Sequence, residues 1–269
     1  MNEAFIEVDS TKCVKCGDCI AACPTCVLEM GDAGPRVRDD QCIECGHCVS
    51  VCPVDAIDNK RTPRAEQQPF DPAKLPTKEQ AALLLRSRRS IRGFEDKPVP
   101  RGTVEELLDL ARVAPTGGNR QGVRFHVIQD APRLQAITEA VMDWAEEHQG
   151  LAPHLASMVA FHRGSGKDNV LRHAPCLILA LMDEATTPMF RRNGQFTLAY
   201  AELYAPMLGL GSCWMGLVEA AATSGDLRVL SLLALPKKTI VTGAIAIGVP
   251  SYHHRRIPTR HPLKVTWTK

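Results

Sequence analysis

The sequence contains no run of about eighteen or more apolar residues, the length that a helix needs to cross a bilayer. Its N-terminal segment, MNEAFIEVDSTK, carries acidic residues where a secretory signal has a basic start followed by an apolar stretch. We therefore expect a cytoplasmic protein without a membrane partner. The 269 residues, 45% of them apolar, are enough for one large core or for two of unequal size.

Cysteine is nearly absent from most of the chain. Only Cys176 and Cys213 lie beyond residue 52, whereas the other nine of the eleven cysteines lie between Cys13 and Cys52. A secreted protein would use so many cysteines for disulfides, but clustered thiols in a cytosolic protein are typical of metal sites. We therefore interpret the first segment as a metal-binding head.

Charge is unevenly distributed, although the formal net charge is only +2. Residues 1–58 hold eleven Asp or Glu against four Lys or Arg, a balance of −7, so the rest of the chain carries +9. An acidic head suits docking to a basic face of its own body or to a basic redox donor. A surface that is merely solvated explains the same balance equally well, so both interpretations stay open.

An internal repeat dominates the head. Four cysteines recur 29 positions later, and Gly17 and Pro24 recur as Gly46 and Pro53. Glycine at this place lets the backbone turn tightly, and proline redirects the chain after the last cysteine. The two sets are Cys13, Cys16, Cys19 and Cys23, followed by Cys42, Cys45, Cys48 and Cys52.

The spacing of these cysteines is typical of 4Fe-4S sites. A Cys-x-x-Cys-x-x-Cys turn directs three thiolates at one cluster, and the fourth must come from elsewhere. Here each triplet is followed by x-x-x-Cys-Pro, so residues 8–58 resemble the bacterial two-cluster ferredoxins, in which that last cysteine ligates the other cluster. The resemblance implies one cluster on Cys13, Cys16, Cys19 and Cys52, and a second on Cys42, Cys45, Cys48 and Cys23.

A pair of zinc sites is the alternative for this head. Zinc knuckles use two pairs of cysteines with a longer gap between them, whereas here four cysteines lie within eleven residues. We therefore expect iron. Cys26, which corresponds to Asp55 in the second repeat, is left over and is expected to be a packing residue or a free thiol.

The rest of the chain divides into a linker and a body. Residues 59–76 are polar and contain four prolines, which disfavour a continuous helix and favour an extended backbone. We therefore expect a head at 1–58, a Pro-rich linker at 59–76 and a body at 77–269.

Helix signals recur along the body. A capping box at Thr77–Gln80 predicts a first helix that ends near the arginine run, and Thr103-x-x-Glu106 predicts the start of a second. A third helix is expected over 132–147. Residues 195–208 are rich in alanine and predict a buried helix with a glycine cap, despite Pro206 within it.

Strand signals lie between these helices. Residues 123–128 alternate as a strand does, and the apolar runs at 176–182 and 240–248 have the length and branching of buried strands. The order predicts an α+β chain: a small two-cluster ferredoxin-like domain, then a mixed sheet flanked by helices.

The densest basic stretch runs from Arg86 to Arg92. Guanidinium groups and a small hydroxyl at this spacing can bind a phosphate from several sides. Taken alone, such a run is more often a solvated helix end or a nucleic-acid patch. Other motifs are needed to decide.

Four motifs in order make the body resemble the FMN-dependent nitroreductase family across residues 78–269. The first is Arg88-Arg89-Ser90-x-Arg92 with the Pro-Val-Pro that follows. The second is the loop 114–121, although Gly-Val follows it where the family has Pro-Trp. The third is GLGSCWMG at 209–216, and the fourth is the strand end IGVP with the basic segment 255–260.

The resemblance implies an FMN-dependent reductase of nitroaromatics, quinones or similar conjugated electrophiles, with no catalytic side chain because the flavin does the chemistry. Arg89 and Ser90 would contact the ribityl chain and ring edge, and Gly216 would allow close approach to the ring. The phosphate would be bound by Arg88, Arg92, Arg256 and Arg260. The implied cofactor residues are Arg88, Arg89, Ser90, Arg92, Pro115, Thr116, Gly117, Asn119, Gln121, Met215, Gly216, Arg256 and Arg260.

In this family the loop at 115–121 reaches the flavin of the partner subunit, which implies a homodimer with FMN at the interface. Electrons would enter through the clusters and pass to FMN, and the donor is a ferredoxin or NAD(P)H. The chain has no Gly-x-Gly-x-x-Gly signature, but members of the family bind nicotinamide directly over the flavin. No nucleic-acid partner is expected.

Two other functions stay open. The chain is either such a reductase or a relay subunit that carries electrons within a larger complex, and a body that has lost its flavin would be a binding module. Residues 149–172 resemble the variable lid of the family, which makes His154, His162 and His173 candidates for substrate contact.

Overall fold

A computed structural model describes residues 5–186 and 188–268, which divide into two compact units. The N-terminal unit runs to Leu75 and includes Gly118–Arg120, and the C-terminal unit holds Pro76–Gly117 and the chain from Gln121 onward. The first residue of the expected linker, Asn59, is the last residue of a strand, and short 3-10 turns occupy Arg64–Glu66 and Pro72–Lys74. The predicted domain boundaries stay a prediction.

The N-terminal unit repeats its backbone as well as its sequence. Gly17 (φ 85°) and Gly46 (φ 72°) adopt the left-handed conformation that glycine allows, and each immediately precedes a one-turn helix. Cys26 (φ 54°) and Asp55 (φ 51°) are a second pair of left-handed residues 29 positions apart. The elements are β1 (Ile6–Val8), α1 (Asp18–Ala21), β2 (Leu28–Gly31), β3 (Gly34–Val37), α2 (His47–Ser50) and β4 (Ile57–Asn59).

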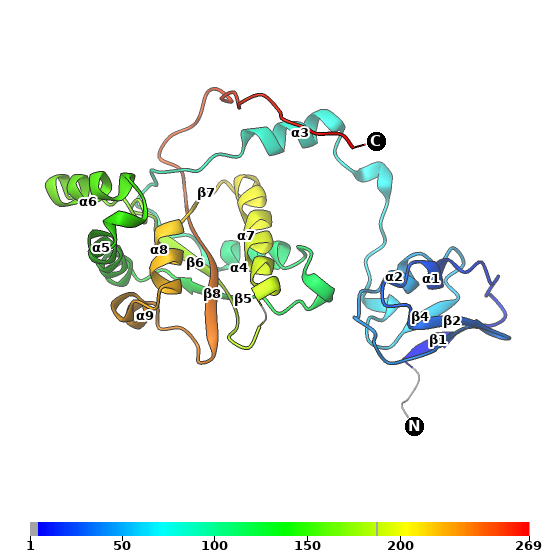
Figure 1. Cartoon of the computed structure of the whole chain (residues 1–269). Helices are drawn as coiled ribbons and strands as arrows, with labels where there is room; N and C mark the ends of the chain where they lie inside the picture. The colour runs from blue at the N-terminus through cyan, green and yellow to red at the C-terminus, as the bar shows by residue number, and fades with distance from the viewer. Residues whose placement is uncertain (1–4, 187, 269) are drawn as a thin grey trace. The chain divides into compact units, whose positions relative to one another are not determined.

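Two antiparallel strand pairs hold this unit together. β1 pairs with β4 and β2 pairs with β3, and the helices lie on one side of them (Figure 1). Phe5, Val27, Leu28 and Ile57 are buried beside the cysteines, so the apolar core surrounds the thiols and limits their access to water.

The C-terminal unit is built on one four-stranded sheet, in the order β5-β6-β8-β7, whose neighbouring strands are antiparallel. The predicted strands are confirmed as β5 (Arg124–Ile128), β6 (Cys176–Asp183) and β8 (Thr239–Gly248), with β7 (Gly211–Trp214) at an edge. A parallel bridge between Ser90 and Ser212 adds a short segment outside β7. The predicted α+β class is thereby confirmed.

Helices cover both faces of this sheet. α4 and α7 pack in one hydrophobic cluster with the sheet, and α5, α6, α8 and α9 pack in another, as the layers in Figure 1 show. The central strands β6 and β8 are therefore buried on both faces. The helices are α3 (Lys78–Ser87), α4 (Arg101–Ala111), α5 (Ala131–Glu147), α6 (His154–Ser165), α7 (Arg192–Tyr204), α8 (Gly216–Thr223) and α9 (Leu227–Leu233).

Local capping explains where several helices begin. The predicted capping box of α3 is confirmed, because Thr77 Oγ1 accepts from Gln80 N and Gln80 Oε1 accepts from Thr77 N. The predicted cap at Thr103 is wrong: α4 already begins at Arg101, after Pro100, whose ring pre-sets the backbone of the entering chain.

The Ala-rich helix is shorter and less buried than predicted. α7 ends at Tyr204, and Ala205–Leu208 form a 3-10 turn closed by Gly209 at φ 70°. Pro206 cannot donate a backbone hydrogen bond, so the α-helix does not continue through it. Phe196 and Tyr200 lie on its exposed face. Among the described residues, no helix is both long and apolar enough to span a membrane.

Candidate functional site

Two cavities in the N-terminal unit are each lined by four of the repeated cysteines. Each combines three cysteines of one repeat with the last cysteine of the other, and all eight thiols are outside disulfides. We call them the Cys13 cavity and the Cys42 cavity. The first is lined by Cys13, Cys16, Cys19 and Cys52, and the second by Cys23, Cys42, Cys45 and Cys48.

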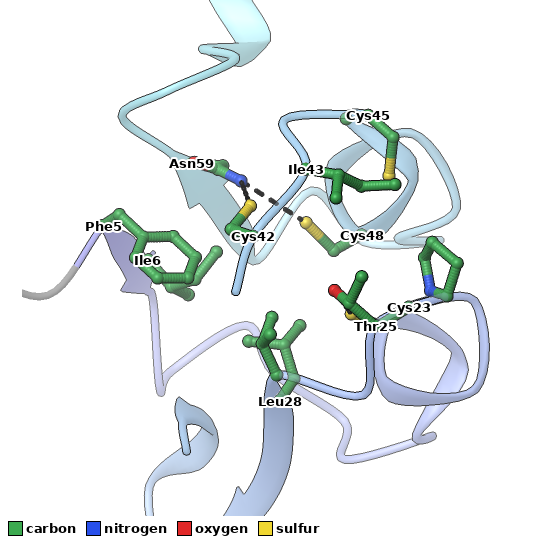
Figure 2. A pocket seen from close by; sticks show the side chains of 13 residues that line it. Phe5, Ile6, Cys23, Thr25, Leu28, Cys42, Ile43, Cys45, Cys48 and Asn59 are labelled. Carbon is green, nitrogen blue, oxygen red and sulfur yellow. Dashed lines mark hydrogen bonds between the residues drawn. The ribbon is translucent and has the colours of Figure 1, made fainter. Parts of the chain in front are cut away.

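Polar N–H groups point at these sulfurs. The backbone N–H of Ala56 donates to Cys52 Sγ at 3.2 Å, and that of Glu44 donates to Cys42 Sγ at 3.4 Å. In the Cys42 cavity the side-chain amide of Asn59 lies 3.9 Å from the Sγ atoms of both Cys42 and Cys48 (Figure 2). Hydrogen-bond donors favour the thiolate form that iron binds.

The thiol pKa values follow burial and these donors. Burial raises the pKa of Cys48, and the amide of Asn59 acts in the opposite direction. Burial also raises the pKa of Cys19. For Cys23, burial is outweighed by the backbone N–H of Val27 and by the polar groups of Thr25, so its pKa lies below the ordinary value. Four convergent sulfurs with N–H donors fit a thiolate-bound cluster in each cavity.

In the C-terminal unit, residues 88–92 run beside the edge strand β7. Ile91 N donates to Ser212 O at 2.8 Å, and Ser90 forms the parallel bridge with Ser212. Residues of this segment contribute to two different cavities. Arg88 and Arg89 line one, which we call the arginine cavity, and Arg92 lines the other, which we call the Met215 cavity.

A partly buried carboxylate, that of Glu202, lies at the arginine cavity. Arg88 Nη1 is 3.7 Å from Glu202 Oε1, and Ser212 Oγ donates to the same oxygen at 3.2 Å. Burial raises the pKa of Glu202, while Arg88 and Ser212 lower it. The side chain of Arg89 has a buried Nε without a hydrogen-bond partner among the described residues. An anion entering this cavity would satisfy that donor.

The Met215 cavity contains two residues that sequence reasoning missed, Asn169 and Arg172. Arg172 Nη1 donates to Asn169 Oδ1 at 2.9 Å. Arg172 has φ 61°, and the loop is held by Asp168, whose carboxylate accepts from three backbone N–H groups at 2.8 Å. The only signal in the sequence was an Asn-x-x-Arg just before a predicted strand.

In the same cavity, part of the backbone is open to a ligand because no side chain crowds it. It is also lined by Met158, Cys213, Trp214, Met215 and Gly216. A Cβ added at Gly216 would meet only Trp214 Cδ1, at 3.8 Å, so no neighbour in the chain requires a glycine there. Trp214 is oriented by a hydrogen bond from its Nε1 to Glu219 Oε2 at 3.0 Å. The open side at Gly216 therefore fits a flat ligand that approaches the backbone.

Comparison with known proteins decides the family. The nitroreductase family profile matches residues 85–249, which is more than half of the chain. The chain belongs to the nitroreductase family. A second profile, that of the 4Fe-4S dicluster domain, matches residues 5–53 and covers all eight repeated cysteines. The chain is thus a nitroreductase-family oxidoreductase with an N-terminal 4Fe-4S dicluster domain.

Individual relatives agree with the nitroreductase assignment. The NADH dehydrogenase of Thermus thermophilus is 27% identical over 206 residues, 69% of this chain and 95% of that protein. A Bacteroides fragilis nitroreductase with bound FMN shares the fold at a TM-score of 0.58 and 18% identity, covering 70% of this chain and 99% of that one. A Desulfovibrio desulfuricans protein solved in complex with FMN is 28% identical at a TM-score of 0.50, covering 70% and 94%.

Not all predicted cofactor residues of the nitroreductase unit come together. Thr116 Oγ1 accepts from Gln121 N at 3.1 Å, and Gly117 N donates to Asn193 Oδ1 at 3.1 Å. A Cβ at Gly117 would lie 2.7 Å from the Phe190 ring, so packing alone explains that glycine. The residues that line neither cavity are Ser90, Pro115, Thr116, Gly117, Asn119, Gln121, Arg256 and Arg260.

The predicted lid histidines have structural surroundings. His162 is buried, with Nδ1 2.9 Å from Lys167 O and Nε2 3.1 Å from Glu139 Oε1. His154 is exposed at the start of α6, and His173 is exposed with φ 56°. Within the predicted lid at 149–172, the residues that line the Met215 cavity are Met158, Asn169, Val170 and Arg172.

Proposed function

We propose that this chain passes electrons from a donor through two 4Fe-4S clusters to FMN and on to a small organic acceptor. The proposal rests on one observation: two four-cysteine cavities and a nitroreductase unit lie on the same chain. In that unit, the arginine cavity lies beside the Met215–Gly216 backbone. The acceptor is a nitroaromatic, a quinone or a similar conjugated electrophile. The donor is a ferredoxin or NAD(P)H.

The cysteines of each cavity hold one cluster. Three thiolates come from one repeat and the fourth from the other, so each cluster also joins the two halves of the head. The backbone N–H groups of Glu44 and Ala56 stabilise the bound sulfurs. The surrounding apolar side chains bury Cys19 and Cys48, whereas Cys16 is exposed.

The nitroreductase unit holds FMN across its two cavities. Arg88 and Arg89 bind the phosphate in the arginine cavity, where Arg89 has an unsatisfied donor. Arg92 lies with Met215 and Gly216 rather than with Arg88, so we assign it to the edge of the flavin ring together with Asn169 and Arg172. Bound FMN supplies the conversion between one-electron and two-electron transfer.

A homodimer completes the site. Members of the family are typically FMN-binding dimers. The 115–121 loop, Arg256 and Arg260 line neither cavity of their own chain, which supports a role at the partner's flavin. The exposed face of α7, with Phe196 and Tyr200, is available for that interface.

An anaerobic preparation tests the function. We expect iron for two 4Fe-4S clusters and one FMN per chain, reduction by dithionite or NAD(P)H, and steady turnover of a nitroaromatic or quinone. Cofactors that are reduced without turnover of any acceptor would favour the relay subunit. A chain that neither carries FMN nor takes it up would refute the proposal for the body.

A further inference from the structure

The two cysteine cavities can be compared position by position, because the repeat relates residues 29 apart. Most of the lining matches: Val27 corresponds to Ala56 and Leu28 to Ile57. The backbone N–H of Ala56 donates to Cys52 Sγ, and that of Val27 donates to Cys23 Sγ in the same way. The main chain thus supplies one matched donor to each cavity, and Glu44 N adds a further donor to Cys42 Sγ in the Cys42 cavity.

Two positions with uncharged side chains break the symmetry in favour of the Cys42 cavity, whereas Lys15, whose counterpart is Glu44, places a cation at the Cys13 cavity. Asn59 lines the Cys42 cavity, whereas its counterpart in the Cys13 cavity is Met30. Thr25 lines the Cys42 cavity, whereas its counterpart is Val54. At each position a side chain that can donate a hydrogen bond faces one set of sulfurs, and an apolar side chain faces the other.

The amide of Asn59 is held with its N–H₂ group toward sulfur. Asn59 Oδ1 accepts from Arg61 N at 2.9 Å, which leaves Nδ2 to face Cys42 Sγ and Cys48 Sγ, both at 3.9 Å (Figure 2). Asn59 is 1% exposed, so water does not compete for these donors. Because the oxygen has a fixed partner, the amide cannot flip without losing three contacts.

Thr25 adds a second donor. Its Oγ1 lies 3.8 Å from Cys23 Sγ, the fourth thiol of the Cys42 cavity. A metal-bound thiolate carries no proton, so the hydroxyl must be the donor once iron is present. Three of the four sulfurs in this cavity therefore face a side-chain donor.

We propose that Asn59 and Thr25 raise the reduction potential of the cluster in the Cys42 cavity above that of the cluster in the Cys13 cavity. One electron from a low-potential donor adds one negative charge to a cluster and its thiolates, and donors aimed at sulfur stabilise the reduced state more than the oxidised state. The first electron to enter the head thus rests on the Cys42 cluster. The inference depends on the cluster sites of the proposed function.

A cation near the other cavity does not reverse this order. Lys15 lines the Cys13 cavity, but the residue is exposed and its ammonium donates to Asp32 O at 2.7 Å. Water and salt screen such an exposed charge, whereas the amide of Asn59 is buried and is not screened by water. The asymmetry in buried donors therefore sets the order of the potentials.

The test is an anaerobic titration of the full chain with dithionite and mediator dyes, followed by electron paramagnetic resonance. The wild-type clusters are expected to reduce in two separate one-electron steps. Asn59→Met inserts the residue that the first repeat has at this position. It should lower the equilibrium constant for reduction in the step at the higher potential about tenfold, which lowers the potential of a one-electron couple by about 59 mV. Thr25→Val should lower the same equilibrium constant about threefold, and Val54→Thr should raise the equilibrium constant of the step at the lower potential.

Iron content separates the possible failures. A wild-type chain without iron refutes the cluster assignment itself. Two clusters that titrate together, or an upper step that stays in place in iron-loaded Asn59→Met and Thr25→Val, overturns the proposed order. If Asn59→Met fails to retain iron, the near-isosteric Thr25→Val alone tests the proposed order of the potentials, because Thr25 lies in a turn and its replacement leaves the strands unchanged.

Discussion

At the scale of single residues, Arg88 is placed to bind an anion. Its guanidinium is 25% exposed and lies 3.7 Å from a carboxylate of Glu202 that is 13% exposed. The pair is too long for a strong hydrogen bond, so the guanidinium keeps donors for a phosphate. Glu202 limits the cost of holding this cation in a half-buried place.

Arg88→Ala should therefore weaken FMN binding. Losing a charge-assisted hydrogen bond costs about 1.5–3 kcal/mol, so the dissociation constant should rise on the order of tenfold to a hundredfold, as measured by flavin fluorescence. Arg86→Ala is the matched control, because Arg86 is an exposed arginine in the last turn of α3. Equal FMN affinity of the two variants would contradict the phosphate assignment.

At the scale of elements, the contact between residues 90–92 and β7 orders both cavities of the body. Gly211 permits this contact, since a Cβ there would lie 2.6 Å from Ile91 Cγ1. The backbone bond from Ile91 to Ser212 depends on that approach. An edge strand and a loop more than a hundred residues apart in the chain thus position the arginines.

Gly211→Ala should push this segment away from β7. We expect a loss of about 1–3 kcal/mol in the free energy of unfolding from overpacking, together with weaker FMN retention. Gly102→Ala is the same substitution on the exposed face of α4, where nothing lies within 4 Å, and should stabilise by about 0.4–1 kcal/mol. Denaturant unfolding of both variants measures the difference, and effects of equal sign would refute the argument.

At the scale of the whole molecule, the exposed face of α7 suggests how two chains associate. Phe196 is 51% exposed and Tyr200 is 39% exposed, four residues apart on one face of the helix, while Leu198 is fully buried on the other. Apolar side chains left in water on one helix face are typical of an interface. The proposed homodimer would cover them.

Phe196→Asp should weaken this dimer. Placing a charge in the buried centre of an interface should raise the dimer dissociation constant roughly thirtyfold or more, measured by analytical ultracentrifugation. Leu227→Asp is the control, because Leu227 is 80% exposed at the start of α9. A wild-type chain that sediments as a monomer, or a Phe196→Asp dimer of wild-type affinity, would contradict the proposed interface.

Local chemistry explains which features were predictable. The Thr77–Gln80 capping box and the strands at 176–182 and 240–248 follow from neighbouring residues, and the structure confirms them. Thr103 failed as a cap because Pro100 had already set the entry of the chain into α4. The alanine-rich pattern predicts a helix end beyond Tyr204, where α7 ends, because the pattern does not register that Pro206 cannot donate a backbone hydrogen bond.

By itself, the sequence determined the cluster head, because three thiolates of each cluster lie three residues apart and each fourth thiolate is marked by the Cys-Pro that closes a repeat, so the pattern is visible along the chain. Only the tertiary structure placed Arg92 apart from Arg88, brought Asn169 and Arg172 to Met215, and buried Glu202 beside the arginines. These placements depend on pairing between distant segments, and no local pattern records which segments will meet. The asymmetry between Asn59 and Met30 follows only from sequence and structure together. The repeat aligns the two residues, and the fold directs the amide of Asn59 at sulfur.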